Sequence, residues 1–259
     1  MNILLNGYLG HMGREVASLC ERGYRGARVA LGVDPSAECS GGIVYKSYSE
    51  IPSVENIDCI VDFSHHLATH ELLKFAREKR LPVVLATTGH TDEEIKEIKD
   101  ASLDIPVFYS GNMSLGIALL IELARTVAAA MPEAEIEIIE KHHDRKIDAP
   151  SGTALMIANA ICDLRPDAYT NLGRSGHGKR TSSEIGIHSV RMGNIVGVHE
   201  VIVGTQNQTI TLKHEAHSRA LFAEGALAAA EFLARMDAGL YDMKSIVSEE
   251  EKDISTVIS

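Results

Sequence analysis

The chain has 259 residues, of which 45% are hydrophobic and 24% charged, the proportions of a globular protein with a full-sized core. Its formal net charge of −11 argues against nucleic-acid binding, because neutralising phosphates requires a basic surface. The longest apolar stretch, around residues 115–131, contains Glu122 and Arg125, so we expect no transmembrane helix and no membrane partner.

The cysteines and the amino terminus indicate a cellular compartment. Four cysteines stand without a CxxC pair: Cys20, Cys39, Cys59 and Cys162. Scattered thiols suit a reducing compartment better than a disulfide framework does. The first residues, MNILLNGYLG, lack the basic segment of a signal peptide, and a glycine ends their apolar run early. We therefore expect a cytoplasmic protein.

In the first part of the chain, short apolar segments alternate with helical patterns. Strands are expected at residues 2–5, 27–34, 57–64, 81–89 and 105–114. Helices are expected at residues 14–23, 67–79 and 91–102. Short strands that alternate with helices of this length form parallel βαβ units. The sequence therefore predicts an α/β domain with a Rossmann-like, doubly wound parallel sheet.

The pattern changes near residue 113. A helix is expected at residues 114–130, and alternating Glu and Ile then predict a half-exposed strand at 133–140. Further strands are expected at residues 184–191, 196–204 and 208–215. Sequential strands joined by short turns form an antiparallel or mixed sheet. A last helix, at 218–236, is expected to return to the first domain, and the acidic tail from Ser248 is expected to fray. We thus expect a domain of residues 1–113 with 217–259, and a smaller α+β domain of residues 114–216.

Three glycines follow the first strand and open the first helix. The segment GYLGHMG places them at Gly7, Gly10 and Gly13. Glycine allows the backbone to approach a pyrophosphate, and the start of a helix offers N–H donors to it. The spacing is GxxGxxG and not GxGxxG, so a plain glycine-rich turn is the alternative. Asp34 favours the dinucleotide site, because it ends the second strand, where a carboxylate binds ribose hydroxyls.

Small and polar residues end two other strands of the predicted parallel sheet. These segments are ATTG at residues 86–89 and SGNMS at residues 110–114. Ligands of such sheets bind beyond the carboxyl ends of the strands, so both segments fit a nucleotide crevice. Each segment alone is more typical of a turn than of a binding site.

The densest group of titratable residues is EKHHDRKIDAPSGTA, at residues 140–154. His142 and His143 follow an apolar strand directly, and Ser151 is expected to cap a helix. One face of that helix is expected to carry Ala154, Leu155, Ala158 and Ile161. The amide groups of Gly152 and Thr153 would then face the same space as the histidines and Lys146. Cations beside a helix start form a receptor for a carboxylate.

Two other interpretations of this segment are possible. Many charge clusters are solvated surface loops, although the preceding strand fixes the position of the two histidines. The letters HHD also suggest a metal site. However, adjacent residues of a strand point to opposite faces, so the two histidines would rarely bind one ion, and we expect no metal.

Motifs along nearly the whole chain resemble those of the 4-hydroxy-tetrahydrodipicolinate reductase (dihydrodipicolinate reductase) family. They are GxxGxMG, VDFS, ATTG, GNMSLG, EKHHDRKIDAPSGTA, HSVRMGNIVGVHEV and HSRALFAEGA, in this order. The HHxxKxDAPSGTA block is highly specific to that family, whereas the glycine motif occurs in many dehydrogenases. The resemblance implies an enzyme of diaminopimelate and lysine biosynthesis that reduces a cyclic, imine-containing dicarboxylate with NAD(P)H.

The resemblance also implies roles for single residues. His142 corresponds to a proton donor or acceptor and Lys146 to a proton donor. The substrate contacts correspond to His143, Gly152 and Thr153. The cofactor contacts correspond to Gly7, Tyr8, Leu9, Gly10, His11, Met12, Asp34, Ala86, Thr87, Thr88, Ser110, Gly111, Asn112 and Met113. The first domain would thus bind the dinucleotide, and the second would bind substrate and build the homotetramer that is common in the family.

Three positions depart from the family pattern and concern the cofactor. Many members have a basic residue in place of His11 and an arginine in place of Pro35, and some have an arginine in place of His65. Asp34 can accept hydrogen bonds from a ribose, but its charge repels a 2′-phosphate. We therefore expect NADH to be used at least as well as NADPH.

Two other classes of protein remain open at this stage. The chain could be another NAD(P)-dependent reductase of the same two-domain plan that acts on a different amino-acid-like substrate. It could also be a nucleotide-sensing protein that has lost catalysis, although such a protein would be expected to lose His142 and Lys146, which are both present.

Overall fold

The computed structural model describes residues 1–38 and 42–249, which divide into two compact units. The first unit contains Met1–Ser114 and the described residues from Ala220 on, and the second contains Leu115–Arg219. Cys39 and most of the tail that was expected to fray lie outside the described residues. Among the described residues, no helix has the length and hydrophobicity needed to cross a bilayer.

The first unit contains a seven-stranded sheet in the order β12-β6-β5-β4-β1-β2-β3. All of its neighbouring strands pair in parallel. The strands are β1 (Asn2–Asn6), β2 (Arg28–Val33), β3 (Val44–Tyr45), β4 (Cys59–Asp62), β5 (Val83–Leu85), β6 (Pro106–Tyr109) and β12 (Gly239–Tyr241). The helices are α1 (His11–Glu21), α2 (Thr69–Lys79), α3 (Asp92–Ala101) and α6 (Ala220–Leu233). Short 3-10 turns lie at Tyr24–Gly26, Tyr48–Glu50 and His66–Ala68. The predicted doubly wound parallel sheet is confirmed.

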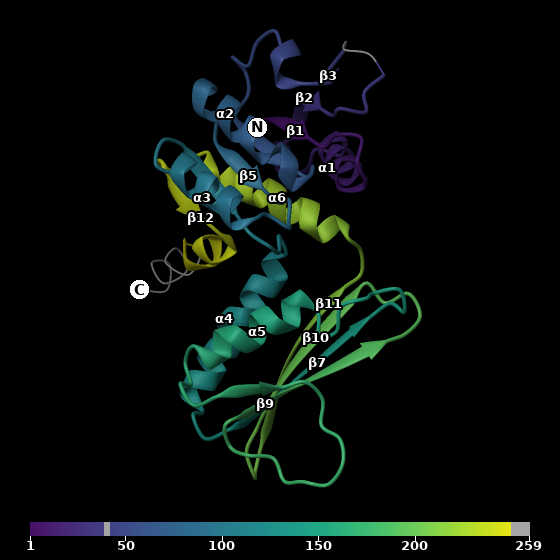
Figure 1. Cartoon of the computed structure of the whole chain (residues 1–259), viewed down its shortest axis with the longest axis vertical. Helices are drawn as coiled ribbons and strands as arrows, with labels where there is room; N and C mark the ends of the chain where they lie inside the picture. Colours follow the sequence, from purple (N-terminus) through teal and green to yellow (C-terminus); the bar gives the residue numbers. More distant parts are fainter. Residues whose placement is uncertain (39–41, 250–259) are drawn as a thin grey trace. The chain divides into compact units, whose positions relative to one another are not determined.

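The second unit contains a five-stranded mixed sheet in the order β11-β10-β7-β9-β8. Its strands are β7 (Glu135–His142), β8 (Tyr169–Asn171), β9 (Glu184–Arg191), β10 (Gly197–Gly204) and β11 (Thr209–Ala216). Strand β7 pairs with β10 in antiparallel and with β9 in parallel orientation. The helices α4 (Leu115–Ala130) and α5 (Gly152–Cys162) lie side by side against one face of this sheet (Figure 1). The smaller α+β domain with a mixed sheet is therefore also confirmed.

The core of the second unit lies between this sheet face and the two helices. Ile136 and Ile138 of β7 pack there with Ile157 and Ile161 of α5, all of them at most 1% exposed. The alternation of Ile in β7 supplies one buried side chain at every second position, as the strand geometry requires. The predicted half-exposed strand therefore forms, with Ile136 and Ile138 turned toward the helices.

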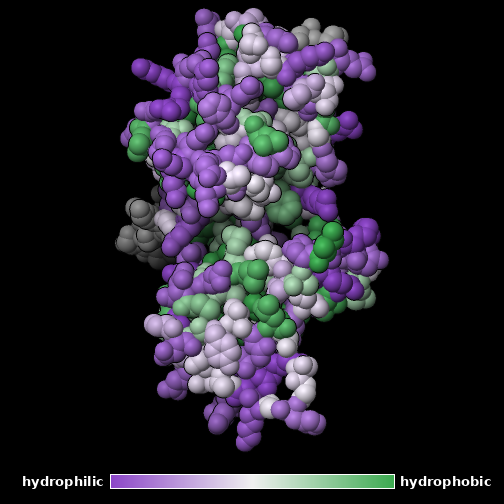
Figure 2. Space-filling model, viewed as in Figure 1, coloured by the Kyte–Doolittle hydropathy of each residue, from purple (hydrophilic) through white to green (hydrophobic). Residues whose placement is uncertain are grey.

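One helix face differs from the prediction. Leu155 is 37% exposed, whereas Ala154, Ile157, Ala158 and Ile161 form the buried face of α5. Successive helical residues are rotated by roughly 100°, so Ile157, three positions after Ala154, completes the stripe and Leu155 does not. Large apolar residues of both helices are exposed: Leu119, Leu123, Leu155 and Met156. Figure 2 shows hydrophobic residues gathered on the surface over these helices.

Candidate active site

The glycine turn after β1 lies against the end of β4. Gly7 has a positive φ of 79°, and a Cβ atom there would lie 2.5 Å from the carbonyl oxygen of Phe63. A Cβ atom on Gly13 would lie 2.1 Å from the carbonyl oxygen of Gly7. Only glycine fits at either position, because both obstacles are backbone atoms. The turn thus lies between β1 and β4, where the strand order reverses and where ligands of doubly wound sheets bind.

The start of α1 and the end of β2 meet at this turn. Gly10 precedes α1 and provides no side-chain cap, so the first amide groups of the helix keep their capacity to bind an anion. Asp34 is only 7% exposed, and its carboxylate accepts hydrogen bonds from the N–H groups of Leu9 and Ser36, both at 2.9 Å. Asp34 therefore holds the glycine turn against β2, in addition to any contact it makes with a ribose.

The other residues predicted to bind the cofactor follow β5 and β6. All strands of this sheet are parallel, so Ala86, Thr87 and Thr88 leave it at the same edge as the glycine turn. After β6, the Ser110 hydroxyl donates to the carbonyl oxygen of Asn112 at 2.8 Å and so folds this segment into a turn. Met113 is 2% exposed, so any contact it makes with a cofactor would come from its backbone. One edge of the sheet thus brings these segments together.

A buried polar cluster at this edge was missed by the sequence analysis. The carboxylate of Asp62, 1% exposed at the end of β4, accepts hydrogen bonds from Asn6 Nδ2 at 2.8 Å and from the Ser64 hydroxyl at 2.6 Å. Burial raises the pKa of Asp62, and the hydrogen bonds from Ser64 and Asn6 act in the opposite direction. The cluster ties the ends of β1 and β4 together beside the glycine turn. A signal was present, because polar residues end both strands.

In the second unit, the two adjacent histidines have different environments. His142 is the last residue of β7 and is 9% exposed, with Nδ1 2.6 Å from Glu140 Oε2. His143 leaves the strand, and its N–H group donates to the carbonyl oxygen of Ile195 at 2.8 Å. Burial lowers the pKa of His142, and the hydrogen bond to Glu140 only partly opposes that effect. The ring of His142 is therefore neutral near pH 7.

Lys146 is held near the histidines by the local turn. Its N–H group donates to the carbonyl oxygen of His143 at 3.2 Å, which folds residues 143–146 back on themselves. Its Nζ donates to Asp148 Oδ1 at 2.7 Å, and its side chain is 22% exposed. An ammonium group at this exposure keeps access to a ligand while the carboxylate of Asp148 stabilises its charge.

The predicted cap of α5 is confirmed. The Ser151 hydroxyl accepts a hydrogen bond from the N–H group of Ala154 at 3.2 Å, and α5 begins at Gly152. A Cβ atom on Gly152 would have no neighbour within 4 Å, so the first turn has open space beside it. The structure thus places Gly152 and Thr153 in the first turn of a capped helix, a few residues after His142, His143 and Lys146.

Three residues that hold this arrangement together were missed by the sequence analysis. They are Glu140, Arg191 and His199. Glu140 is fully buried. The side chains of β7 alternate regularly between the two faces, but the doubled Ile138–Ile139 reverses the order of Glu and Ile in the sequence, so that Glu140 takes a position facing the helices. The shift was visible in the sequence. Arg191 and His199 lie about fifty residues further along the chain, and no local pattern indicates their contact with Glu140 or Ser151.

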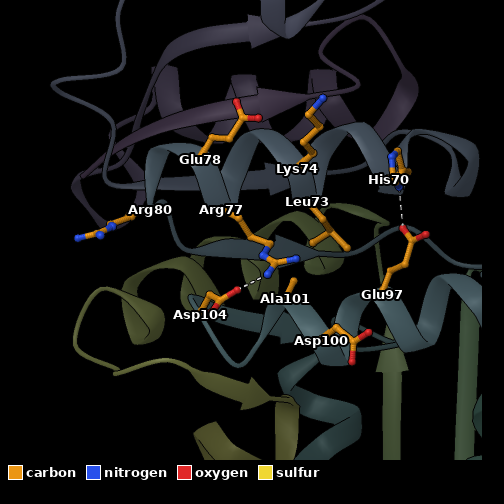
Figure 3. Close-up of a pocket in the computed structure, with 10 residues that line it drawn as sticks. All are labelled: His70, Leu73, Lys74, Arg77, Glu78, Arg80, Glu97, Asp100, Ala101 and Asp104. Carbon is orange, nitrogen blue, oxygen red and sulfur yellow. Dashed lines mark hydrogen bonds and ion pairs between the residues drawn. The ribbon is translucent and has the colours of Figure 1, made fainter.

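A separate groove of about 860 Å³ lies between α2 and α3 of the first unit. Figure 3 shows ion pairs across it, between His70 and Glu97 and between Arg77 and Asp104. None of the predicted site residues lines this groove. The active site is therefore not assigned to this groove. Among the residues that the structure describes, no group of His, Cys, Asp or Glu could hold a metal ion.

Comparison with known families identifies the family of the chain. The model "Dihydrodipicolinate reductase, N-terminus" matches residues 1–113, and "Dihydrodipicolinate reductase, C-terminus" matches residues 116–247. The chain belongs to the dihydrodipicolinate reductase family. A 4-hydroxy-tetrahydrodipicolinate reductase of Caldanaerobacter subterraneus subsp. tengcongensis is 43% identical over 251 residues, which are 96% of this chain and 99% of that protein. A reductase of the same name from Clostridium novyi is 41% identical, over 96% of this chain and 98% of that protein.

Solved structures show the same fold. A dipicolinate-bound dihydrodipicolinate reductase from Paenisporosarcina sp. TG-14 superposes with a TM-score of 0.81 at 22% identity, over 95% of this chain and 99% of that chain. A diaminopimelate dehydrogenase of C. glutamicum superposes with a TM-score of 0.56 at 13% identity, over 94% and 93% of the two chains. At this identity the likeness shows a shared fold, and the fold alone does not select the reaction.

Proposed function

We propose that the protein reduces 4-hydroxy-tetrahydrodipicolinate to tetrahydrodipicolinate with a nicotinamide cofactor, as the name of its relatives implies. The observation that carries the proposal is the joining of His142, Lys146 and the start of α5 by one short segment of the second unit. The test is the oxidation of NADH or NADPH by the purified protein, supplied with freshly generated substrate. No turnover with either cofactor would refute the proposal.

The residues of the first unit fit a dinucleotide. The glycine turn leaves no room for a side chain beside Phe63, and α1 begins without a side-chain cap. Gly7, Gly10 and the first turn of α1 would hold the pyrophosphate, and Asp34 would accept hydrogen bonds from the ribose. The segments at residues 86–88 and 110–113 would border the rest of the cofactor. When bound, the nicotinamide supplies a hydride.

The residues of the second unit would hold the substrate and move the proton. The amide groups at the start of α5, in Gly152 and Thr153, would bind one carboxylate, with His143 as a further contact. Reduction of a conjugated imine leaves electron density on the ring, and a positioned acid must neutralise it. Lys146 would donate this proton. His142 would exchange a proton with the ring at Nε2, because its Nδ1 is bound to Glu140.

The alternative is a reductase of the same plan with a different amino-acid-like substrate. The likeness of the fold to that of a DAP dehydrogenase supports this alternative. Competing assays with the cyclic substrate and with linear amino acids distinguish the two. Faster turnover of a linear amino acid would favour the alternative.

We expect NADH to be used at least as well as NADPH, and Asp34→Asn to shift the preference toward NADPH. Asparagine removes the charge that repels a 2′-phosphate, and its one side-chain oxygen keeps an acceptor for only one of the two N–H groups, that of Leu9 at Oδ2 or that of Ser36 at Oδ1. Two like charges about 4 Å apart repel by about 1 kcal/mol in water and by more near a protein, so the ratio of the specificity constants should change at least about fivefold. The measurement is kcat/KM for both cofactors with both proteins. A tenfold preference of the unaltered protein for NADPH would contradict the expectation and would indicate Arg14, which is exposed on the first turn of α1, as the partner of the phosphate.

We also expect a homotetramer built through the mixed sheet of the second unit. The helices cover one face of this sheet, and the other face carries half-buried apolar side chains, among them Ile139, Val190 and Ile202. These apolar side chains lie among charged ones such as Glu137, Lys141 and Glu200, and the resemblance to the family supports the expectation that this face joins subunits. Light scattering at micromolar concentration measures the mass. The mass of a monomer would refute this expectation.

A further inference from the structure

Glu140 is the point at which three elements of the second unit meet. Its carboxylate accepts four hydrogen bonds. Oε1 accepts from Arg191 Nη2 at 2.6 Å and from the N–H group of Ser151 at 3.1 Å. Oε2 accepts from Arg191 Nη1 at 2.7 Å and lies 2.6 Å from His142 Nδ1. One fully buried side chain thus links the ends of β7 and β9 to the start of α5.

The bond to Glu140 determines which nitrogen of His142 carries the proton. Burial would raise the pKa of Glu140, but the hydrogen bonds from Arg191 and His142 outweigh it and lower this pKa to about 2. The carboxylate is therefore ionised and can only accept, so Nδ1 must be the donor. In the neutral ring, Nε2 then carries the lone pair. Nε2 faces Gly197, where a Cβ atom would lie only 3.2 Å away.

The carboxylate of Glu140 also fixes the start of α5, which would bind a carboxylate group of the substrate. The N–H group of Ser151, the residue that caps α5, donates to Glu140, and its hydroxyl accepts from Ala154. The hydroxyl also lies 3.1 Å from His199 Nε2, and the rings of His199 and His142 are 5.3 Å apart. The proton-exchanging ring and the start of the helix are therefore held by one network.

We infer that Glu140, held by Arg191, is a positioning residue that fixes His142 in the Nδ1–H tautomer and so makes Nε2 the atom that exchanges a proton with the substrate. This inference rests on the proposed function for its catalytic consequence only. Neutral His142 is a proton acceptor, and it donates from Nε2 only after it has become an imidazolium ion, which the carboxylate of Glu140 stabilises. Because His142 is neutral in the resting protein, Lys146 and not His142 donates the proton to the substrate.

The charged and titratable groups around His142 are Glu140, Lys146, Arg191 and His199. Glu140 is the one anion among them and raises the pKa of His142, whereas Lys146 and Arg191 lower it. Burial lowers the pKa of His199 to about 4, so this ring is neutral near pH 7. Removing the charge of Glu140 should therefore lower the pKa of His142 further.

The test is Glu140→Gln, and the arrangement of donors predicts its outcome. A glutamine oxygen in place of Oε1 still accepts from Ser151 and Arg191 Nη2, whereas its NH2 group in place of Oε2 faces His142 Nδ1 and only one fixed donor, Arg191 Nη1. The opposite orientation would bring the NH2 group against two fixed donors, the N–H group of Ser151 and Arg191 Nη2. The amide should therefore donate to Nδ1 and convert His142 to the Nε2–H tautomer. Nitrogen NMR of the labelled imidazole, which needs no substrate, measures the tautomer and the pKa directly.

In steady-state assays, Glu140→Gln should lower kcat at least about tenfold, and at most by the 10²–10⁴-fold that loss of the group itself costs. In the profile of kcat/KM against pH, the limb that reports the titration of His142 should move to lower pH. The KM for the cofactor should not change. Glu140→Gln leaves the charge of Arg191 without its buried counter-ion, which could prevent folding. The double variant Glu140→Gln/Arg191→Met is therefore tested beside it. It removes both charges and should show the same change of tautomer.

The matched control lies on the opposite face of the same strand. Glu137 also bonds a histidine and faces an arginine, with His188 Nε2 at 2.9 Å and Arg180 Nη2 at 3.3 Å. Glu137→Gln should leave the tautomer of His142 and the position of its limb unchanged. An Nδ1–H tautomer that persists in the folded Glu140 variants, or a fall in kcat with no change of the limb, would overturn the inference. If the unaltered protein fails to turn over the substrate, the proposed function fails while the NMR result still decides the role of Glu140.

Discussion

Replacing Lys146 or His142 with alanine should lower kcat about 10²–10⁴-fold, the usual cost of losing a positioned acid or base. Both side chains lie in the second unit, whereas the glycine turn and Asp34 belong to the first. The affinity for the cofactor should therefore change little. The measurements are kcat with saturating substrate and the dissociation constant of NADH by calorimetry.

The control for Lys146→Ala is Lys213→Ala. Each of these lysines pairs with a carboxylate two residues further along the chain, with Nζ–O distances of 2.7 Å in both pairs. Deleting an exposed pair of this kind costs about 0–1 kcal/mol, so Lys213→Ala should keep nearly full turnover. If Lys146→Ala does the same, its assignment as the proton donor is wrong. An equal loss in both variants would point to the ion pair and not to proton transfer.

The elements that the sequence predicted correctly are those whose information is local. The helix cap at Ser151 needs only the hydroxyl and the N–H group of Ala154, three residues away. The strands β1, β4 and β5 are buried on both faces and are therefore nearly continuous in apolar residues. The doubly wound sheet follows from the alternation of such strands with helices. The strands predicted at residues 57–64, 81–89 and 105–114 were longer than the observed ones, because the polar residues after each strand belong to the turns.

The parts that could not be predicted depend on contacts between distant residues. The strands β3, β8 and β12 have two or three residues each and take their conformation from their neighbours in the sheet. Arg191 reaches Glu140 only because β7 and β9 pair in parallel, in a register that places His142 opposite Arg191. A sequence shows that these residues are charged, but not that the strands which carry them are neighbours. The buried network behind His142 is therefore a result of the tertiary structure.

Gly13→Ala should weaken the binding of NADH about 10–100-fold. The added Cβ atom would lie 2.1 Å from the carbonyl oxygen of Gly7 and 2.7 Å from that of Tyr8. Both are backbone atoms, so the first turn of α1 must move away from the glycine turn that would hold the pyrophosphate. Overpacking of this kind typically costs about 1–3 kcal/mol, which corresponds to the predicted loss of affinity if the distortion falls on the binding site. Calorimetry with NADH and thermal unfolding followed by circular dichroism separate an effect on binding from one on stability.

The control for Gly13→Ala is Gly178→Ala in the second unit, where an added Cβ atom would have no neighbour within 4 Å and φ lies outside the left-handed region. Replacing glycine with alanine at a compatible position stabilises a protein slightly, by about 0.4–1 kcal/mol, because the unfolded chain loses freedom. This variant should therefore bind NADH normally and unfold at the same or a slightly higher temperature. Normal binding of NADH by Gly13→Ala would mean that α1 can shift without disturbing the turn. The glycine segment would then be a packing device between β1 and α1, and the cofactor would have to be held by other residues at that edge of the sheet.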